Sequence, residues 1–178
     1  MAWLRRRRVP AEVEGALDLG RGERVLACAL DERTDAYVVA TTARLAVVPA
    51  PDAVSPGSAR SVELRRSWSD VEGGAWEPRT GTISVTWVAG GRAAQWTLRE
   101  GGERFAQVFY ERVAASLLID APLDHEGRPL GRVAIRRDLA TGQLLRQVIW
   151  IRGVRRDDAA VQARAERLLD ALGEGVGM

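Results

Sequence analysis

The chain has 178 residues, of which 46% are hydrophobic and 28% are charged, and its formal net charge at pH 7 is +2. This is the usage of an ordinary globular protein that can bury a core. No stretch reaches the ~20 consecutive apolar residues of a transmembrane helix, and the N-terminus lacks the apolar segment of a signal peptide. We therefore expect a cytoplasmic protein.

Two features of the composition limit the chemistry. The single cysteine, Cys28, excludes an internal disulfide framework and a zinc site built from several thiolates. It lies within VLACAL and is predicted to be a buried small hydrophobe. All 26 basic residues are arginines, and asparagine does not occur. This bias is typical of a GC-rich genome such as an actinobacterial one, so arginine content alone is weak support for nucleic-acid binding.

Charge is distributed unevenly along the chain. Residues 1–8 carry a net +4, residues 9–120 carry 12 arginines against 16 acidic residues, and residues 121–178 carry 10 against 8. The sequence thus combines a basic tail, an acidic body and a basic C-terminal end.

The first part of the chain reads as a short helix followed by a series of short strands. Pro10 and the following AEVEGAL indicate a helix with acidic residues in its first turn. Alternating or apolar runs then predict about seven antiparallel strands, the clearest at 23–30, 37–40, 44–48, 61–64, 82–88 and 94–98. The last two form a hairpin around Gly90-Gly91, and Trp87 and Trp96 on its apolar face are predicted to be core residues.

Past Gly101-Gly102 the periodicity changes from that of a strand to that of a helix. Residues 103–118 carry an apolar stripe and are predicted to form an amphipathic helix on the sheet. Residues 121–128 read as a connector, and 132–137 with 143–152 as a second hairpin. A three-residue loop, 140–142, would place Ile135 opposite Gln147, Val133 opposite Ile149, Arg132 beside Trp150 and Arg136 beside Arg146. Asp157 or Asp158 then caps a last amphipathic helix.

These elements predict an α+β protein with three parts. Residues 1–19 form a basic tail and a short helix, residues 20–120 form the main domain, and residues 121–178 form a ββα appendage packed on it. The appendage has too little core to fold alone.

Two short patterns in residues 20–120 resemble bacterial pleckstrin-homology-like (PH-like or GRAM-like) domains. YVVATTARLAVV, from Tyr37 to Val48, resembles their strand that ends in Leu-Thr, turns and restarts with Arg-Leu, and SWSDV at 67–71 resembles the segment that follows. The resemblance implies an antiparallel meander or barrel of about seven strands capped by one helix. Relatives bind phosphoinositides, peptides or proteins; here the turn at 31–35 is more acidic than basic, which argues against a phosphoinositide pocket.

Catalytic motifs are not evident in the sequence. We find no convincing nucleophile with a base, carboxylate pair, metal cluster or phosphate-binding loop, and we predict a non-catalytic protein without cofactor or metal. The only histidine, His125, lies between Asp124 and Glu126 and is predicted to be an exposed turn residue. A pocket with convergent polar groups would favour an enzyme instead.

The N-terminal tail, MAWLRRRR, is the first candidate binding element. Trp3 beside the cations of Arg5, Arg6, Arg7 and Arg8 could contact an anionic membrane, at about 1 kcal/mol per basic residue near the surface. The alternatives are a disordered tail in an arginine-rich proteome, or a contact with nucleic acid or an acidic protein.

The second candidate is the outer face of the C-terminal hairpin, where arginines flank a tryptophan. Its residues are Arg132, Arg136, Arg146, Trp150 and Arg152, with Arg155 and Arg156 just beyond. They could hold phosphates and stack a base. The alternative is an arginine that simply stacks on the tryptophan across the strands.

Two classes of function follow. The first is a non-catalytic interaction module that binds a protein partner or a second copy of itself through sheet edges or the appendage. The second is an anionic-surface binder, at the inner membrane face or on nucleic acid, that acts through the N-terminal and hairpin arginines. Binding through arginines should weaken steeply with ionic strength, whereas an apolar protein interface should not.

Overall fold

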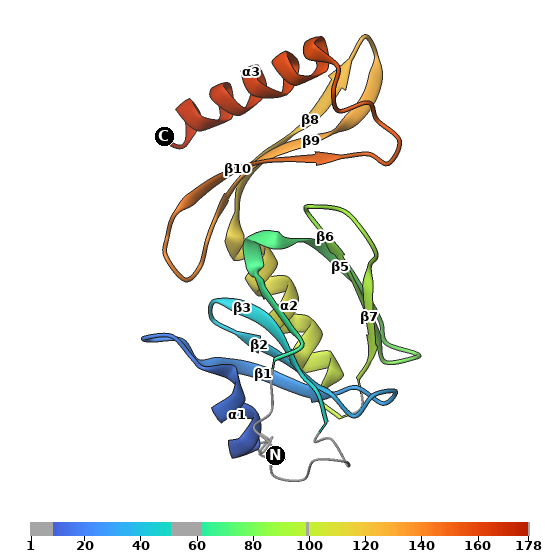
Figure 1. Ribbon diagram of the computed structural model, residues 1–178, viewed down its shortest axis with the longest axis vertical. Helices are drawn as coiled ribbons and strands as arrows, with labels where there is room; N and C mark the ends of the chain where they lie inside the picture. The colour runs from blue at the N-terminus through green and yellow to red at the C-terminus, as the bar shows by residue number, and fades with distance from the viewer. Residues whose placement is uncertain (1–8, 51–61, 99, 178) are drawn as a thin grey trace, which may run out of the picture.

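The computed structural model describes residues 9–50, 62–98 and 100–177. This part of the chain forms ten strands in three antiparallel sheets, with three α-helices and one short 3-10 helix. Figure 1 shows α1 and α3 at opposite ends of the molecule, with α2 between them. We call β1–β7 with α1 and α2 the first unit, and β8–β10 with α3 the C-terminal unit.

The first sheet is a meander of four consecutive strands, β1 (Val25–Leu30), β2 (Tyr37–Thr41), β3 (Arg44–Val48) and β4 (Leu64–Ser67). The predicted strands at 23–30, 37–40 and 44–48 are confirmed within two residues. The strand predicted at 61–64 begins only at Leu64, and residue 61 lies outside the described residues. Consecutive residues of β2 and β3 are buried, so both faces of this sheet are covered.

Helix α1 (Ala11–Leu17) covers the outer face of the first sheet, as its two buried residues show. Val13 and Leu17 form a small apolar cluster with Val39, Ala46 and Val48. The end of the helix is held by arginines of the sheet: the guanidinium groups of Arg44 and Arg65 both donate to the Leu17 carbonyl oxygen, at 3.2 and 3.0 Å. Cations at a helix C-terminus satisfy its unpaired carbonyl groups and oppose the negative end of the helix dipole.

Glu23 connects this helix end to the sheet. Its carboxylate accepts hydrogen bonds from the Arg44 guanidinium at 2.8 and 2.9 Å, from the Thr41 hydroxyl at 2.6 Å and from the Gly20 amide at 3.0 Å. Burial alone would raise the pKa of Glu23. The hydrogen bonds from Thr41 and Gly20 and the positive charge of Arg44 outweigh burial, and the pKa lies below its ordinary value of 4.5.

Replacing Glu23 with glutamine is expected to lower the free energy of unfolding at pH 7 by about 1–3 kcal/mol, because buried donors lose a charged acceptor. Since the pKa is lower in the folded state, the carboxylate contributes fully above about pH 4.5 and its contribution disappears as the pH falls through the folded-state value. Urea unfolding from pH 7 to about pH 2.5 should show the wild type losing stability more steeply than Glu23→Gln. The exposed Asp124→Asn variant is the control. A difference that stays constant with pH would contradict the role of the carboxylate.

The second sheet contains β5 (Val71–Glu77), β6 (Thr82–Trp87) and β7 (Ala94–Thr97), again in sequence order. It meets the first sheet at one corner, where Asp31 pairs with Leu98 and the Asp31 carboxylate accepts from the Thr97 amide at 2.8 Å. The described strands therefore form separate sheets. The barrel that the sequence suggested is not closed.

Helix α2 (Gly102–Ser116) fills the space between these two sheets. Its buried face, with Phe105, Val108 and Phe109, shares one apolar core with residues from both sheets. Gly74 of β5 allows the close approach, because a Cβ atom there would lie 2.7 Å from the Phe109 ring. The predicted helix at 103–118 is confirmed apart from its last two residues, which belong to β8. Trp96 belongs to the core as predicted, whereas Trp87 is only partly buried at its edge.

The third sheet has three strands, β8 (Leu117–His125), β9 (Arg128–Arg137) and β10 (Leu144–Trp150), with β9 in the centre. The predicted ββα appendage is thus βββα. Most of the expected connector at 121–128 belongs to β8, an edge strand that tolerates Pro122. His125 is the last residue of β8 and is half-buried, so its prediction as an exposed turn residue is corrected. Asp158 caps α3 (Ala159–Gly175), whose buried face includes Val161, Ala165 and Leu169.

The register predicted for the second hairpin is wrong by one residue. Ile135 faces Arg146, Val133 faces Val148, and Arg136 faces Leu145. The cause is Asp138, whose carboxylate accepts from the backbone amides of Ala140 and Thr141 and whose own amide donates to the Gln143 carbonyl. These bonds close a four-residue loop in place of the predicted three-residue loop. Because a shift of one residue changes the pairing of every side chain, the predicted neighbours of the arginines change too.

Candidate functional site

The C-terminal sheet has α3 on one face and the first unit on the other. Val133 and Ile135 of β9 pack with Ala165 and Leu169 of α3. Arg132 and Arg136 lie on the opposite face and donate to backbone carbonyl groups of β5. The face that the sequence predicted to be an exposed basic surface therefore forms the joint between the two units.

Arg136 is the centre of this joint and is only 1% exposed. Its guanidinium donates to the Val71 carbonyl at 2.8 Å, to the Ser116 hydroxyl at 3.1 Å and to the Glu72 carbonyl at 3.3 Å. Burial, and secondarily the charge of Arg132, lower the pKa of Arg136 from its usual value. A contact of Arg136 with an external anion, as predicted from the sequence, is excluded by this burial.

A β-bulge supplies the acceptors for the joint. The register between β5 and β6 shifts between Val71 and Gly73, which leaves Glu72 without a counterpart on β6. Its carbonyl oxygen accepts from Arg136 and, at 3.3 Å, from Arg132. Bulges commonly redirect backbone groups in this way.

Two further polar contacts complete the joint. The Gln147 side-chain amide donates to the Ser69 carbonyl at 3.0 Å, and the Ser67 hydroxyl donates to the Asp138 carboxylate at 3.0 Å. Burial alone would raise the pKa of Asp138. Hydrogen bonds, chiefly from the amides of Thr141 and Ala140, lower the pKa by more than burial raises it, so the pKa lies below its ordinary value. The segment 67–72 is thus the part of the first unit to which the C-terminal sheet binds.

The other predicted site residues are dispersed. Arg146 pairs with Glu166 and Asp170 of α3 at 3.0 and 2.8 Å, and Arg132 pairs with Asp120 at 3.3 Å. Arg152 is exposed, and Trp150 is half-buried beside the α3 cluster. Trp3 and Arg5 to Arg8 lie outside the described residues, so their predicted roles stay predictions.

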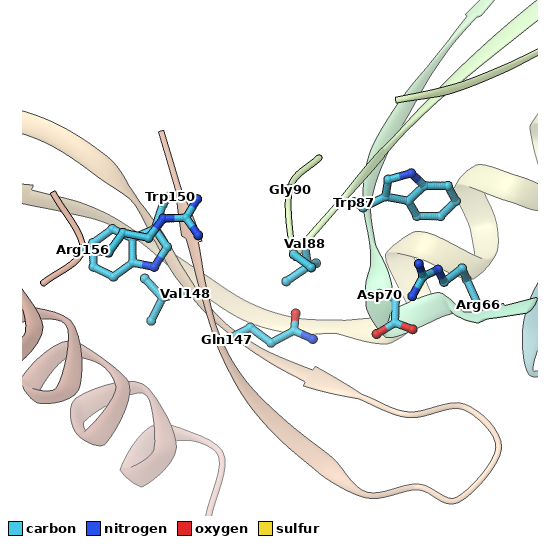
Figure 2. A pocket seen from close by; sticks show the side chains of 10 residues that line it. Arg66, Asp70, Trp87, Val88, Gly90, Gln147, Val148, Trp150 and Arg156 are labelled. Carbon is cyan, nitrogen blue, oxygen red and sulfur yellow. The ribbon is translucent and has the colours of Figure 1, made fainter. Parts of the chain in front are cut away.

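A cleft of about 310 Å³ opens where the two units meet. Figure 2 shows Trp87 and Arg66 on one side and Trp150 and Arg156 on the other, with Val88, Gly90 and Gln147 between them. The lining comes from β4, the 3-10 helix (Trp68–Asp70), the end of β6, the β6–β7 turn, β10 and the segment after β10. It comprises Arg66, Asp70, Trp87, Val88, Ala89, Gly90, Gln147, Val148, Trp150 and Arg156.

The polar groups of the cleft are notable for having few internal partners. The Arg66 guanidinium lies over the Trp87 ring, 5.8 Å from its centroid. Within the described part of the chain, the side chains of Arg66, Asp70 and Arg156 form no ion pair or hydrogen bond, and the Gln147 side-chain oxygen is buried without a hydrogen-bond partner. The two guanidinium groups and the Asp70 carboxylate therefore remain available to a ligand, together with two tryptophan rings.

Few side chains of the kinds that act as nucleophile or general base line the cleft. Its ten lining residues include one carboxylate and no histidine, cysteine, serine or lysine. Across the described ranges, no three His, Cys, Asp or Glu side chains lie close enough together to hold a metal ion. None of the helices in this part of the chain has the length and apolar character needed to cross a bilayer.

No protein-family model matches the chain, and no curated protein sequence matches it either.

Proposed function

We propose that this protein is a non-catalytic protein-interaction module that binds a polypeptide segment of a partner in the cleft between its two units. The observation that carries the proposal is the lining of the cleft, where Trp87 and Trp150 stand on opposite sides with unpaired arginines beside them. Tryptophan and arginine are the side chains most enriched at the energetic centres of protein interfaces.

As part of this proposal, the first unit is a PH-like domain. The support is the order of elements in this unit, in which β1–β7 precede α2. In such a scaffold the sheets and the helix would form the rigid base, and the C-terminal unit would supply the second wall of the cleft.

Binding to an anionic surface is the second candidate function. Arg152, Arg155 and Arg156 are exposed in a short segment just beyond Trp150, which favours a phosphate contact there. Against it, Arg132, Arg136 and Arg146 of the same predicted patch are engaged within the chain.

A peptide-display selection with the full chain as the target tests the first function. We expect enriched peptides whose affinity falls at least about tenfold when Arg66 and Arg156 are replaced with glutamate, because these exposed side chains lie beside both tryptophans. Arg33→Glu and Arg79→Glu, exposed arginines of the first unit that do not line the cleft, are the matched controls.

Two outcomes would count against the module. One is a selection that enriches no peptide while oligo(dT) or anionic vesicles bind in a salt-sensitive manner, which would favour the second function. The other is a set of peptides that bind the cleft variants and the control variants equally well.

A further inference from the structure

Strand β10 is an edge strand with an open hydrogen-bonding side. The order of the sheet is β10-β9-β8, so β10 has only one neighbour among the described strands. The bonds from the Asp138 amide to Gln143 and from the Ile151 amide to Leu130 show that odd-numbered residues of β10 bond to β9. In an antiparallel ladder, the backbone groups of the residues between them point the other way. Those of Arg146, Val148 and Trp150 therefore point away from the sheet.

The cleft lies along this open edge. Gln147 comes from the face of the sheet that contacts the first unit, whereas Val148 and Trp150 come from the face that packs on α3. All three line the same cleft. A cavity that touches both faces of an edge strand must run beside its backbone, and Figure 2 shows Val148 and Trp150 on the side of the cleft opposite Trp87, with Gln147 between the two sides.

Strand β10 has fewer of the features by which proteins usually protect an edge than β8 has, since Arg146 is its one charged residue. Its sequence, LLRQVIW, contains no proline, and its pairing with β9 has no bulge. Strand β8, the other edge of the same sheet, carries Pro122 and the exposed Asp124, and its pairing is interrupted twice. A largely apolar edge without proline or bulge favours pairing with another strand.

The opposite wall limits what can pair with β10. It is the β6–β7 turn, with Val88, Ala89 and Gly90, and it belongs to a different sheet. At about 310 Å³ the cleft is at the lower end of the range for ligand pockets. This size favours a single extended segment beside the edge over a second folded copy, which would meet the turn.

The charges indicate the chemistry of that segment. Arg66 and Arg156 stand on the two walls without ion-pair partners in the described part of the chain, and Asp70 is the only acidic lining residue. Arg152 and Arg155 add exposed positive charge where the edge ends. Side chains of an added strand would point alternately to the two faces of the sheet. Arg66 comes from the first unit, which contacts the Gln147 face. Arg156 lies beside Trp150 of the other face, so carboxylates on both faces of the added strand would meet a guanidinium.

We propose that an acidic, extended segment of a partner protein adds to the open edge of β10 as a fourth strand of the C-terminal sheet, inside the cleft. This proposal rests on the proposed function and specifies its partner. Main-chain hydrogen bonds to residues 146, 148 and 150 supply affinity, and contacts with the two tryptophans and the two arginines select the sequence.

The first test is the variant Val148→Pro, with Val148→Ala as its control. The amide of Val148 points away from β9, so proline at this position leaves the β9–β10 pairing intact but removes a donor from the edge. We expect the selected peptides to be enriched in Asp and Glu and to bind Val148→Pro at least about tenfold more weakly than Val148→Ala. Far-UV circular dichroism checks that both variants are folded.

The second test uses the peptides and does not depend on the folding of a variant. Methylation of the backbone nitrogens at every second residue of a selected peptide removes the donors on one of its edges. If the peptide adds as a strand, methylation of one set of alternate nitrogens should abolish binding, and methylation of the other set should leave binding nearly unchanged. Replacing the acidic residues of a selected peptide with lysine should weaken its binding to the wild-type protein. The same lysine peptide should regain binding to the double variant Arg66→Glu, Arg156→Glu.

The outcomes separate this inference from the function on which it rests. One outcome is a set of peptides that lose affinity for the arginine variants and yet bind Val148→Pro normally or tolerate methylation of both sets of nitrogens. Such peptides would overturn strand addition and leave the interaction module in place. Selected peptides without acidic enrichment would overturn the assigned chemistry. Failure to select any peptide, with retention of oligo(dT) or anionic vesicles, would overturn both.

Discussion

Replacement of Arg136 with alanine is expected to lower the free energy of unfolding by about 3–5 kcal/mol. The side chain is buried and donates to three acceptors, two of which are backbone carbonyl groups of β5 and one a hydroxyl at the end of α2. Alanine would leave a cavity and remove one donor from each acceptor, although the Glu72 carbonyl would keep its hydrogen bond from Arg132. The loss should be large because these bonds connect β9 to two elements of the first unit at once.

Urea unfolding followed by circular dichroism measures this effect, and Arg137→Ala is the matched control. Arg137 is the next residue of β9 and is exposed, so its removal should change the stability by less than about 0.5 kcal/mol. Arg136→Lys should fall between the two, because an ammonium group keeps the charge but not the planar fork of donors. A loss below about 1 kcal/mol for Arg136→Ala would mean that the joint does not depend on this residue.

Much of the fold could be predicted because its elements carry regular patterns. The alternation in TISVTW, the apolar stripe of α2 and the Asp158 cap of α3 each reflect local geometry and appear at the predicted places. Strand β8 was missed because Pro122 and Asp124 interrupt its pattern, as is common at a sheet edge. The register of the second hairpin was missed because a side chain, Asp138, sets the loop length.

Most of the candidate site could not be predicted from the sequence. The cleft combines residues near 66–70, 87–90 and 147–156, and only the packing of the C-terminal sheet on the first unit brings them together. Trp150 was identified from its arginine neighbours, but Arg136 and Arg146 turned out to bind other parts of the chain. The one available signal was the LLRQVIW run itself, which is mostly apolar and free of proline.

Replacement of Trp68 with alanine is the second large expected effect, at about 3–5 kcal/mol. Trp68 is fully buried in the core shared by the first two sheets and α2, with its ring edge-on to Phe109 at 5.9 Å. Its indole nitrogen donates to the Thr41 carbonyl at 3.0 Å, and its own carbonyl accepts from Ser116 at 3.3 Å. The residue therefore links the first sheet to the end of α2, beside the segment that binds the C-terminal sheet.

Comparison with Trp68→Phe separates the contribution of the ring from that of its hydrogen bond. Phenylalanine keeps most of the apolar volume but leaves the Thr41 carbonyl without the indole donor, which should cost about 1–2 kcal/mol. Ile151→Ala, at a side chain that is 47% exposed, should change the stability by less than about 0.5 kcal/mol. Equal losses for alanine and phenylalanine would show that the hydrogen bond, and not the packing of the ring, holds the two sheets and α2 together. The β10 edge would then depend on a polar network that extends from Thr41 through Ser116 to Arg136.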